Sequence, residues 1–371
     1  MGLLTKFSVL FLSSVLALAS LAAPAASPLP MIAPIEAGFS AKRLEVLHRR
    51  LAQEVDAGRY SGYITLLARD GQIVDWRAHG WQDIAARTPM QRDSIVRIYS
   101  MSKIITSVSI LLLLEEGRLK LSDPVEKYLP LLKNRMVLKG GTADAPELEP
   151  ANRSITIRDL LTHTAGYYYD ATWSADPVPA ELLRRQDIWN AVNLDDFVAR
   201  VAPAPLHEQP GTRYRYGISV DLLGAIVEKA SGQRLDLFFQ ERIFRPLGMV
   251  DTGFWVPSEK QGRVATIYQR DGSGQLVPDA GMNANHVTAE RGVMSGGGGL
   301  YSTAADYVRF AQMLLNGGQL DGTRILSRKT VELMTQNHLK HLASPHPFGA
   351  RAQGFGLGVR VMTDLGESSV L

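Results

Sequence analysis

The sequence lacks cysteine entirely over its 371 residues. Disulfide bonds are therefore excluded, and so is a lipoprotein anchor, which requires a cysteine after the leader peptide. A protein without disulfides must be stabilised by its hydrophobic core, and a chain of this length can bury a sufficient one.

The sequence also lacks a strong excess of charge of either sign. Its 40 Lys and Arg residues nearly balance 37 Asp and Glu residues, which leaves a formal net charge of +3. Because the basic residues are scattered rather than clustered, no nucleic acid is predicted as a partner. With 45% hydrophobic and 21% charged residues, the composition is typical of a soluble enzyme with one large domain or two interleaved ones.

Several hydrolase and nucleotide-binding signatures are missing. There is no Gly-x-Ser-x-Gly elbow and no His-Glu-x-x-His, and none of the eight histidines has an evident zinc partner. No metal or other cofactor is therefore predicted. The glycine run 296–299 is not followed by Lys-Ser or Lys-Thr, so a packing turn is favoured over a phosphate loop. His163 is interpreted as a structural histidine rather than a catalytic base.

Residues 1–26 have the pattern of a secretory signal peptide. Lys6 precedes the apolar run 7–19, and Ala23-Pro24-Ala25 offers a small-x-small cleavage site. The apolar run is shorter than the about 20 residues that span a bilayer, although a membrane anchor stays open as an alternative. We expect a periplasmic or secreted protein with no stable membrane insertion after cleavage.

Hydrophobic periodicity predicts a mixture of helices and strands. The helix after Ser102 is apolar on nearly all sides and should be central and buried. Asp70-Gly71 predicts a hairpin turn, Ser122-Asp123-Pro124 predicts the start of a helix, and 131–215 is expected to be irregular. The predicted helices span 40–57, 102–116, 220–230 and 303–315, and the predicted strands span 63–68, 72–76 and 356–362.

The predicted strands lie only near the two ends of the chain. A mostly antiparallel sheet built from both ends, with a largely helical part between them, fits this order better than a regular βαβ alternation. We therefore predict an α/β fold for the domain 27–371. In this division 27–120 and 290–371 form the α/β part, and 121–289 forms the mainly helical part.

Ser100 and Lys103 form the only Ser-x-x-Lys in the chain. Residues three apart share one face of a helix, so the lysine can take the proton of the serine without a histidine. Burial at the start of an apolar helix would favour a neutral amine at Lys103, and the helix N-terminus would favour negative charge developing near Ser100. The alternative is a helix-capping serine followed by a solvated lysine.

Tyr216 is the third candidate for the site. The turn Pro210-Gly211-Thr212 that precedes it can project a side chain into a cleft. Taken alone, Tyr216 would be one of 12 tyrosines that are mostly structural.

Five stretches together resemble the serine β-lactamase superfamily, which includes class C β-lactamases, family VIII carboxylesterases, D-stereospecific peptidases and related acyltransferases. The resemblance implies a β-lactamase/transpeptidase-like fold. It also implies that Ser100 is the acylated nucleophile, that Lys103 is its base, and that Tyr216 relays protons to the leaving group and from water. The Ser100 backbone N–H would supply half of the oxyanion hole. The matching stretches are RIYSMSK (97–103), TIRDLLTHTAG (156–166), PGTRYRY (210–216), RPLGM (245–249) and GGLYSTAAD (298–306).

Two departures from the family pattern bear on activity. Class C β-lactamases carry Tyr-x-Asn, whereas Ile218 stands at the third position here and cannot make the amide hydrogen bond to a lactam. The C-terminal Lys-Thr-Gly, His-x-Gly or Trp-Gly-Gly motif does not occur, since Lys329-Thr330 is followed by valine. We expect a C-terminally truncated copy that lacks the last strands and the C-terminal helix and that is inactive as it stands.

The predicted function of the intact enzyme is hydrolysis of short-chain acyl esters through an acyl-enzyme. A β-lactamase and a D-amino-acid peptidase or acyltransferase are alternatives within the superfamily. A non-catalytic protein that binds cell-wall ligands is the alternative from another class. The expected partner of an enzyme of this kind is a small-molecule ester or amide substrate, and the sequence does not predict an oligomeric state.

Overall fold

The computed structural model describes residues 29–169, 176–284, 292–344 and 347–368. The predicted signal peptide, 1–26, therefore lies wholly outside the described residues. The helices are α1 (Ala41–Asp56), α2 (Ser102–Glu115), α3 (Ile157–Leu161), α4 (Pro177–Arg184), α5 (Leu194–Val201), α6 (Ser219–Ser231), α7 (Leu235–Phe239), α8 (Arg245–Leu247), α9 (Ala280–Ala284), α10 (Ala304–Leu315) and α11 (Arg328–Met334).

The strands are short apart from the first two, and all the pairs between them are antiparallel. They are β1 (Gly62–Arg69), β2 (Gln72–Asp83), β3 (Thr88–Pro89), β4 (Val96–Arg97), β5 (Met136–Gly141), β6 (Pro146–Pro150), β7 (Tyr268–Arg270), β8 (Leu276–Pro278), β9 (Tyr301–Ser302), β10 (Gln319–Leu320), β11 (Thr323–Arg324), β12 (Gln353–Phe355) and β13 (Arg360–Met362).

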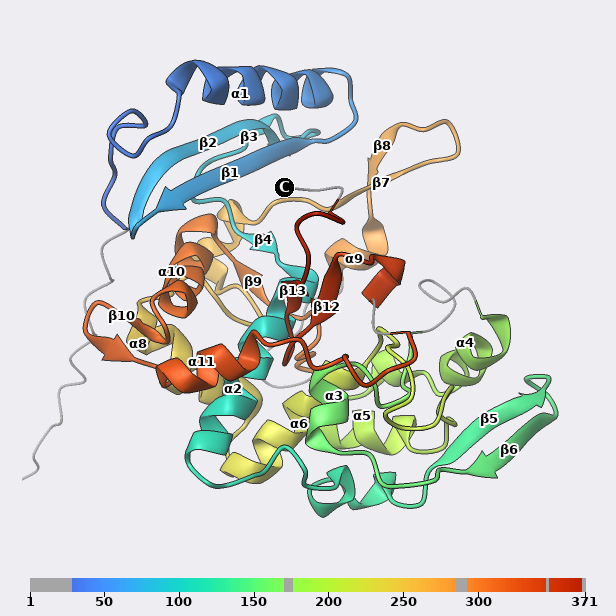
Figure 1. The fold of residues 1–371 in the computed structure, drawn as a ribbon. Helices are drawn as coiled ribbons and strands as arrows, with labels where there is room; N and C mark the ends of the chain where they lie inside the picture. The colour runs from blue at the N-terminus through green and yellow to red at the C-terminus, as the bar shows by residue number, and fades with distance from the viewer. Residues whose placement is uncertain (1–28, 170–175, 285–291, 345–346, 369–371) are drawn as a thin grey trace, which may run out of the picture.

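The N-terminal part is a sheet with the strand order β1–β2–β3, covered by helices (Figure 1). Helix α1 packs on one face and α10 on the other. Asp70 and Gly71 close the β1–β2 hairpin with φ angles of 50° and 78°, the left-handed values that a tight Asp-Gly turn requires. The predicted hairpin and helix 40–57 are confirmed.

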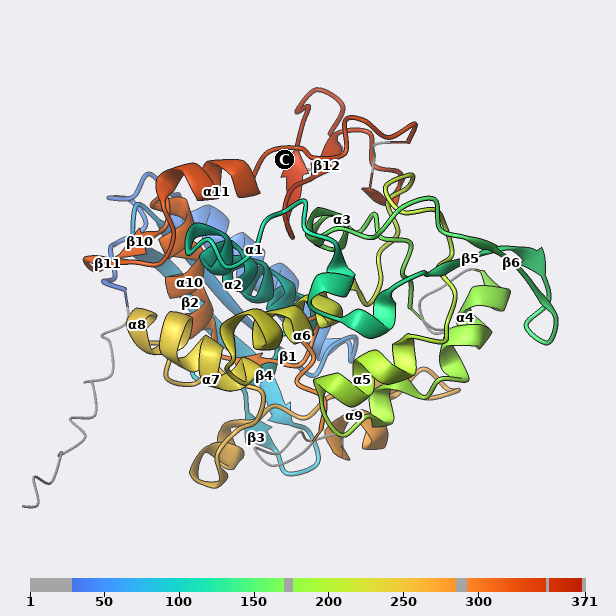
Figure 2. The same ribbon diagram turned by 90° about the horizontal axis from the view of Figure 1, so that it is seen from below.

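Helix α2 is the centre of the molecule (Figure 2). Eleven of its 14 residues are buried, which confirms the expectation from its all-round apolar sequence. It packs against α6, whose apolar residues belong to the same core cluster. The segment that begins at Ser102 is therefore fixed from several sides, and so is the turn that precedes it.

Two parts of the chain far apart in sequence meet beside the start of α2. Strand β4 pairs with β9, with Val96 opposite Ser302, and Gly253 forms a further bridge to Tyr301. These pairs bring residues before α2 next to residues that follow the glycine run 296–299. The described residues are thus helices packed with antiparallel strands, as the α/β prediction states.

Three expectations about local structure are wrong. Residues 122–124 begin only one turn of 3-10 helix, Val125–Lys127, because Leu129 precedes a proline and leaves the helical conformation. The segment 131–215 contains the β5–β6 hairpin, α3, α4 and α5, so strands are not confined to the two ends. These elements are too short to establish a period in the sequence.

The predicted strand 356–362 is instead the turn of a hairpin followed by its second strand, β13. Strands β12 and β13 pair with Phe355 opposite Arg360, and Gly358 in the turn has a φ of 85°. Its N–H donates to Leu161 O at 2.9 Å, and a Cβ there would lie 1.9 Å from Ser107 Oγ. The glycine is needed because the turn packs directly on α2.

No helix in the part of the chain described by the structure is both long and apolar enough to cross a membrane.

Candidate active site

Ser100 lies on a one-turn 3-10 helix, Tyr99–Met101, that leads directly into α2. Ile98 N–H donates to Leu300 O at 3.0 Å, which fixes the backbone just before this turn. Tyr99 has a φ of 43°, a left-handed value that is costly for a residue with a bulky side chain. The result is an exposed serine at the start of a buried helix.

Lys103 is buried, with only 4% of its surface exposed, as expected from the sequence. Its Nζ lies 3.2 Å from Ser100 Oγ and donates to Gly297 O at 2.6 Å and to Tyr169 OH at 3.0 Å. The rings of Tyr216 and Tyr169 also face this nitrogen, with centroids 4.7 and 5.6 Å away. The amine is therefore held in one place by three polar contacts and two aromatic faces.

Tyr216 completes the group predicted from the sequence. Its OH donates to Ser100 Oγ at 2.7 Å, so this oxygen lies between a phenol and an amine. Both distances are within hydrogen-bonding range. The structure thus brings together Ser100, from the turn before α2, and Tyr216, from the loop before α6, which are 116 positions apart.

The loop that follows α3 supports Tyr216. His163 O accepts a hydrogen bond from Arg215 N–H at 2.7 Å, and the rings of His163 and Tyr216 pack with centroids 4.8 Å apart. A Cβ on Gly217 would lie 2.5 Å from Tyr168 Cα, so only glycine allows the two segments to approach. His163 thus packs next to Tyr216, but neither of its ring nitrogens has a hydrogen-bond partner among the described residues, so it is not the satisfied structural histidine that the sequence predicts.

The glycine run 296–299 passes beside α2 and contacts two of its residues. Thr106 Oγ1 donates to Gly296 O at 2.7 Å, and a Cβ on Gly296 would lie 2.9 Å from Val220 O. These close approaches confirm the interpretation as a packing turn. The sequence did not predict that the next residue, Gly297, would also contact Lys103.

Three buried titratable groups surround Lys103. Desolvation raises the pKa of the Asp221 carboxyl, and the positive charge of Lys103 partly offsets this effect. Burial, with the Lys103 charge as the second cause, lowers the pKa of His163 to about 3, so its imidazole is neutral at pH 7. Burial also raises the pKa of Tyr169, which is therefore a neutral hydroxyl.

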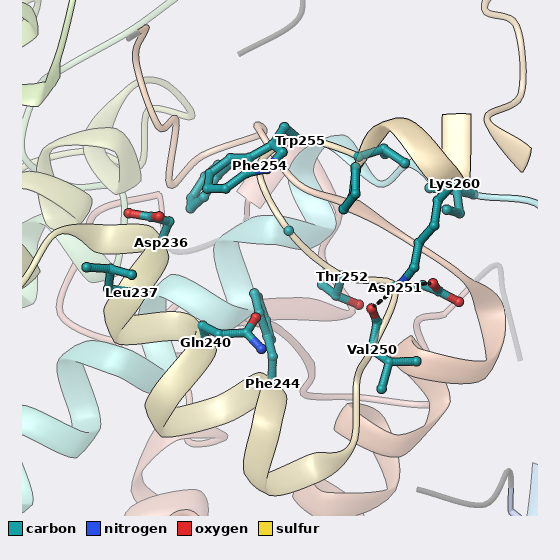
Figure 3. Close-up of a pocket in the computed structure, with 14 residues that line it drawn as sticks. Asp236, Leu237, Gln240, Phe244, Val250, Asp251, Thr252, Phe254, Trp255 and Lys260 are labelled. Atoms are coloured by element: carbon teal, nitrogen blue, oxygen red, sulfur yellow. Dashed lines mark hydrogen bonds and ion pairs between the residues drawn. The ribbon is translucent and has the colours of Figure 1, made fainter. Parts of the chain in front are cut away.

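A cavity of about 270 Å³ lies elsewhere, between α7 and the segment 250–257 (Figure 3). Phe244, Phe254 and Trp255 contribute much of its apolar wall. Its charged groups are already paired, since Lys260 contacts Asp251 at 2.8 Å. Ser100, Lys103 and Tyr216 do not line this cavity.

Over the described residues, no three His, Cys, Asp or Glu side chains are grouped so that they could hold a metal ion. The hydroxyl of Ser100 lies between an amine and a phenol. Such an arrangement can make a hydroxyl nucleophilic and can return a proton to a leaving group.

Comparison with known proteins agrees with this geometry. Residues 47–368 match the protein family described as Beta-lactamase. The chain belongs to this family. An uncharacterised protein of Mycobacterium tuberculosis (strain CDC 1551 / Oshkosh) is 38% identical over 325 residues, which cover 85% of this chain and 78% of that protein. The family's members include serine hydrolases, esterases among them.

Two relatives have names that describe an activity. Esterase EstB of Burkholderia gladioli is 32% identical over 303 residues, covering 77% of this chain and 72% of EstB. Lovastatin esterase of Penicillium rubens is 30% identical over 329 residues, covering 84% of this chain and 77% of that enzyme. Among solved structures, EstCE1, described as a hydrolase with promiscuous acyltransferase activity, has a TM-score of 0.71 at 28% identity and covers 90% of this chain and 85% of its own.

Three residues of the site were missed by sequence reasoning. Tyr169 is one of three consecutive tyrosines, 167–169, and nothing in its sequence context distinguishes it from its neighbours. Gly297 was recognised only as part of a glycine run, and Asp221 lies on a helix five residues after Tyr216. Only the folded chain shows that all three surround Lys103.

Proposed function

We propose that this protein is a carboxylesterase that hydrolyses small, short-chain acyl esters through an acyl-enzyme at Ser100. The observation that carries the proposal is the position of Ser100 Oγ, 3.2 Å from Lys103 Nζ and 2.7 Å from Tyr216 OH. A hydroxyl flanked by a base and a proton donor is the arrangement that covalent catalysis requires.

Acylation begins when Ser100 Oγ attacks the carbonyl carbon of the ester. Lys103, acting as the base, takes the hydroxyl proton as a bond forms between Oγ and carbon. Negative charge collects on the former carbonyl oxygen, where the Ser100 backbone N–H at the helix N-terminus can stabilise it. When the intermediate collapses, Tyr216 gives its proton to the departing alcohol and regains one from Lys103.

Deacylation repeats these steps with water as the nucleophile. The water loses one proton as its oxygen attacks the acyl carbon: Tyr216 accepts this proton while passing its own to Lys103. The bond to Ser100 Oγ then breaks, the carboxylic acid leaves, and the proton returns to the serine oxygen. No cofactor is needed, because protons and the acyl group are all that is transferred.

Ile218 supports an esterase rather than a β-lactamase. Its side chain is fully buried at the start of α6, two residues after Tyr216, so it offers no polar group to a substrate. A polar side chain at this position would be needed to bind the amide of a lactam substrate. The esterases among the relatives support the same choice.

The test is covalent labelling of the protein with a fluorophosphonate, followed by peptide mapping. We expect a single adduct on Ser100 and turnover of p-nitrophenyl acetate that Ser100→Ala lowers by about three orders of magnitude or more. A folded protein that gives no adduct, or an adduct on another serine, would refute the proposal.

A further inference from the structure

Asp221 is a carboxyl group buried completely on α6, and it contacts the same glycine, Gly297, that Lys103 contacts. Its Oδ1 accepts hydrogen bonds from Ser295 Oγ at 2.5 Å and from Gly297 N–H at 3.0 Å. Its Oδ2 has no hydrogen-bond partner among the described residues. A carboxyl group is expensive to bury, so its position calls for an explanation.

Gly297 connects Asp221 to Lys103. The N–H of this residue donates to Asp221, and its carbonyl oxygen accepts from Lys103 Nζ at 2.6 Å. A Cβ on Gly297 would lie 2.4 Å from Asp221 Oδ2, so only glycine lets the carboxyl approach this closely. The backbone of Gly297 is thus held by a residue of α6 through its N–H and contacts a residue of α2 through its carbonyl oxygen.

The Gly297 carbonyl determines how the amine of Lys103 is oriented. A neutral lysine has two N–H donors and one lone pair, and a carbonyl oxygen can only accept. One N–H must therefore be directed to Gly297, and the second is directed to the hydroxyl of Tyr169. The lone pair then remains for the hydroxyl proton of Ser100.

We propose that Asp221 is a positioning residue for Lys103: it anchors the backbone at Gly297, and the carbonyl of this residue turns the lone pair of the amine toward Ser100. This inference rests on the proposed role of Lys103 as the base. Asp221 is not itself a catalytic residue, because its hydrogen bonds are to Ser295 and Gly297 and not to Ser100 or Lys103. The buried carboxyl and the glycine run then act together to orient Lys103.

The test compares Asp221→Asn with Asp221→Ala in the full chain, using p-nitrophenyl acetate as the substrate. The amide oxygen of asparagine can still accept from Gly297 N–H, so kcat should stay within about threefold of the wild type. Alanine releases the peptide, and kcat should fall on the order of 100-fold, as expected for a base displaced by about 1 Å. KM should change little in both variants, because Asp221 does not contact the substrate.

Asp306→Asn is the matched control. Asp306 is also a buried carboxyl that accepts a backbone N–H, from Asp251 at 2.7 Å, but it belongs to a different part of the fold. The kcat of the Asp306→Asn variant should equal that of the wild type. Thermal melting of each variant establishes that the measured molecules are folded.

Gly297→Ala provides a second route if Asp221→Ala folds poorly. The added methyl group would collide with Asp221, so kcat should fall. The loss in the double variant Asp221→Ala/Gly297→Ala should be smaller than the two single-variant losses combined, because both changes disturb the same contact. Wild-type kcat in folded Asp221→Ala, or an equal loss in the Asn and Ala variants, would overturn the inference. Neither result would affect the labelling of Ser100 in the wild type, on which the proposed function depends.

Discussion

Lys103 is the residue on which the proposed chemistry depends most directly. Lys103→Arg keeps a positive charge at the site, but a guanidinium group stays protonated and cannot accept the proton of Ser100. We predict that Arg lowers kcat for p-nitrophenyl acetate by about 1000-fold or more, as expected when an essential base is lost. The measurement is steady-state turnover together with fluorophosphonate labelling, and an Arg variant with substantial activity would exclude lysine as the base.

Ile218 leads to a prediction about substrate choice. Because this buried side chain offers no hydrogen bond, short-chain aryl esters should be hydrolysed with a much higher kcat/KM than nitrocefin or a penicillin. Ser100→Ala serves as the control, since it should abolish both activities if both use the same nucleophile. Efficiencies in the reverse order would assign the protein to the β-lactamases instead.

His163 makes stability depend on pH. Its pKa is lowered to about 3 in the folded protein by burial, whereas an unfolded histidine has a pKa of about 6.5. Between these values the unfolded chain binds a proton that the folded protein excludes. The neutral imidazole therefore contributes its full stability above pH 6.5, and this contribution is lost as the pH falls from 6.5 toward 3.

The variant His163→Asn tests this effect, because asparagine tolerates the left-handed φ of 55° at this position. We predict that the free energy of unfolding falls more steeply with decreasing pH in the wild type than in the variant. The difference in slope should be at most about 1.4 kcal/mol per pH unit. Urea unfolding at pH 7.5, 5.5 and 4.5 measures it, and equal slopes would contradict a buried neutral histidine.

At the scale of elements, the short helix α3 leads into the loop that carries His163 and supports Tyr216. Thr156 Oγ1 accepts from Asp159 N–H at 3.2 Å, and Asp159 Oδ2 accepts from Thr156 N–H at 2.8 Å, which forms a capping box. Thr156→Ala should lower the free energy of unfolding by about 1 kcal/mol. It should also reduce kcat, because α3 leads into the loop that carries His163.

Ser327→Ala is the control for this prediction. Ser327 Oγ caps α11 by accepting from Thr330 N–H at 3.2 Å, and α11 does not contact Ser100, Lys103 or Tyr216 through any hydrogen bond described here. The two alanine variants should lose similar stability in urea unfolding, but only Thr156→Ala should lose activity. An equal effect on kcat would mean that α3 has no special role in supporting the site.

The elements also show what the sequence can predict. The helices 40–57, 220–230 and 303–315 agree with α1, α6 and α10 to within one or two residues, because long amphipathic segments have a clear period. Helix α3 has five residues, too few to show one. In the site, Ser100 and Lys103 share a local pattern, whereas Gly297 lies 194 positions from Lys103 and is brought to it only by tertiary packing.

At the scale of the whole molecule, the site is built where the most deeply buried elements meet. Lys103 and Thr106 come from α2, Asp221 comes from α6, and both helices belong to the main core cluster. The β5–β6 hairpin, by contrast, extends away from this core (Figure 1), and most of its residues are exposed or half-buried. Rigidity should therefore be highest next to the catalytic residues and lowest at this hairpin.

Hydrogen exchange tests this distribution. Amides in α2 and α6 should exchange only through global unfolding, because opening them would expose the core, while amides near the turn 142–145 should exchange through local opening. Mass spectrometry of peptides after timed labelling measures both rates in one sample. Limited proteolysis with a non-specific protease should then cut first within 141–146 and leave Ser100 reactive toward a fluorophosphonate, since the hairpin contributes no residue to the site. If α2 peptides exchange as fast as hairpin peptides, the catalytic lysine is not held by a rigid core, and its fixed position would need another source.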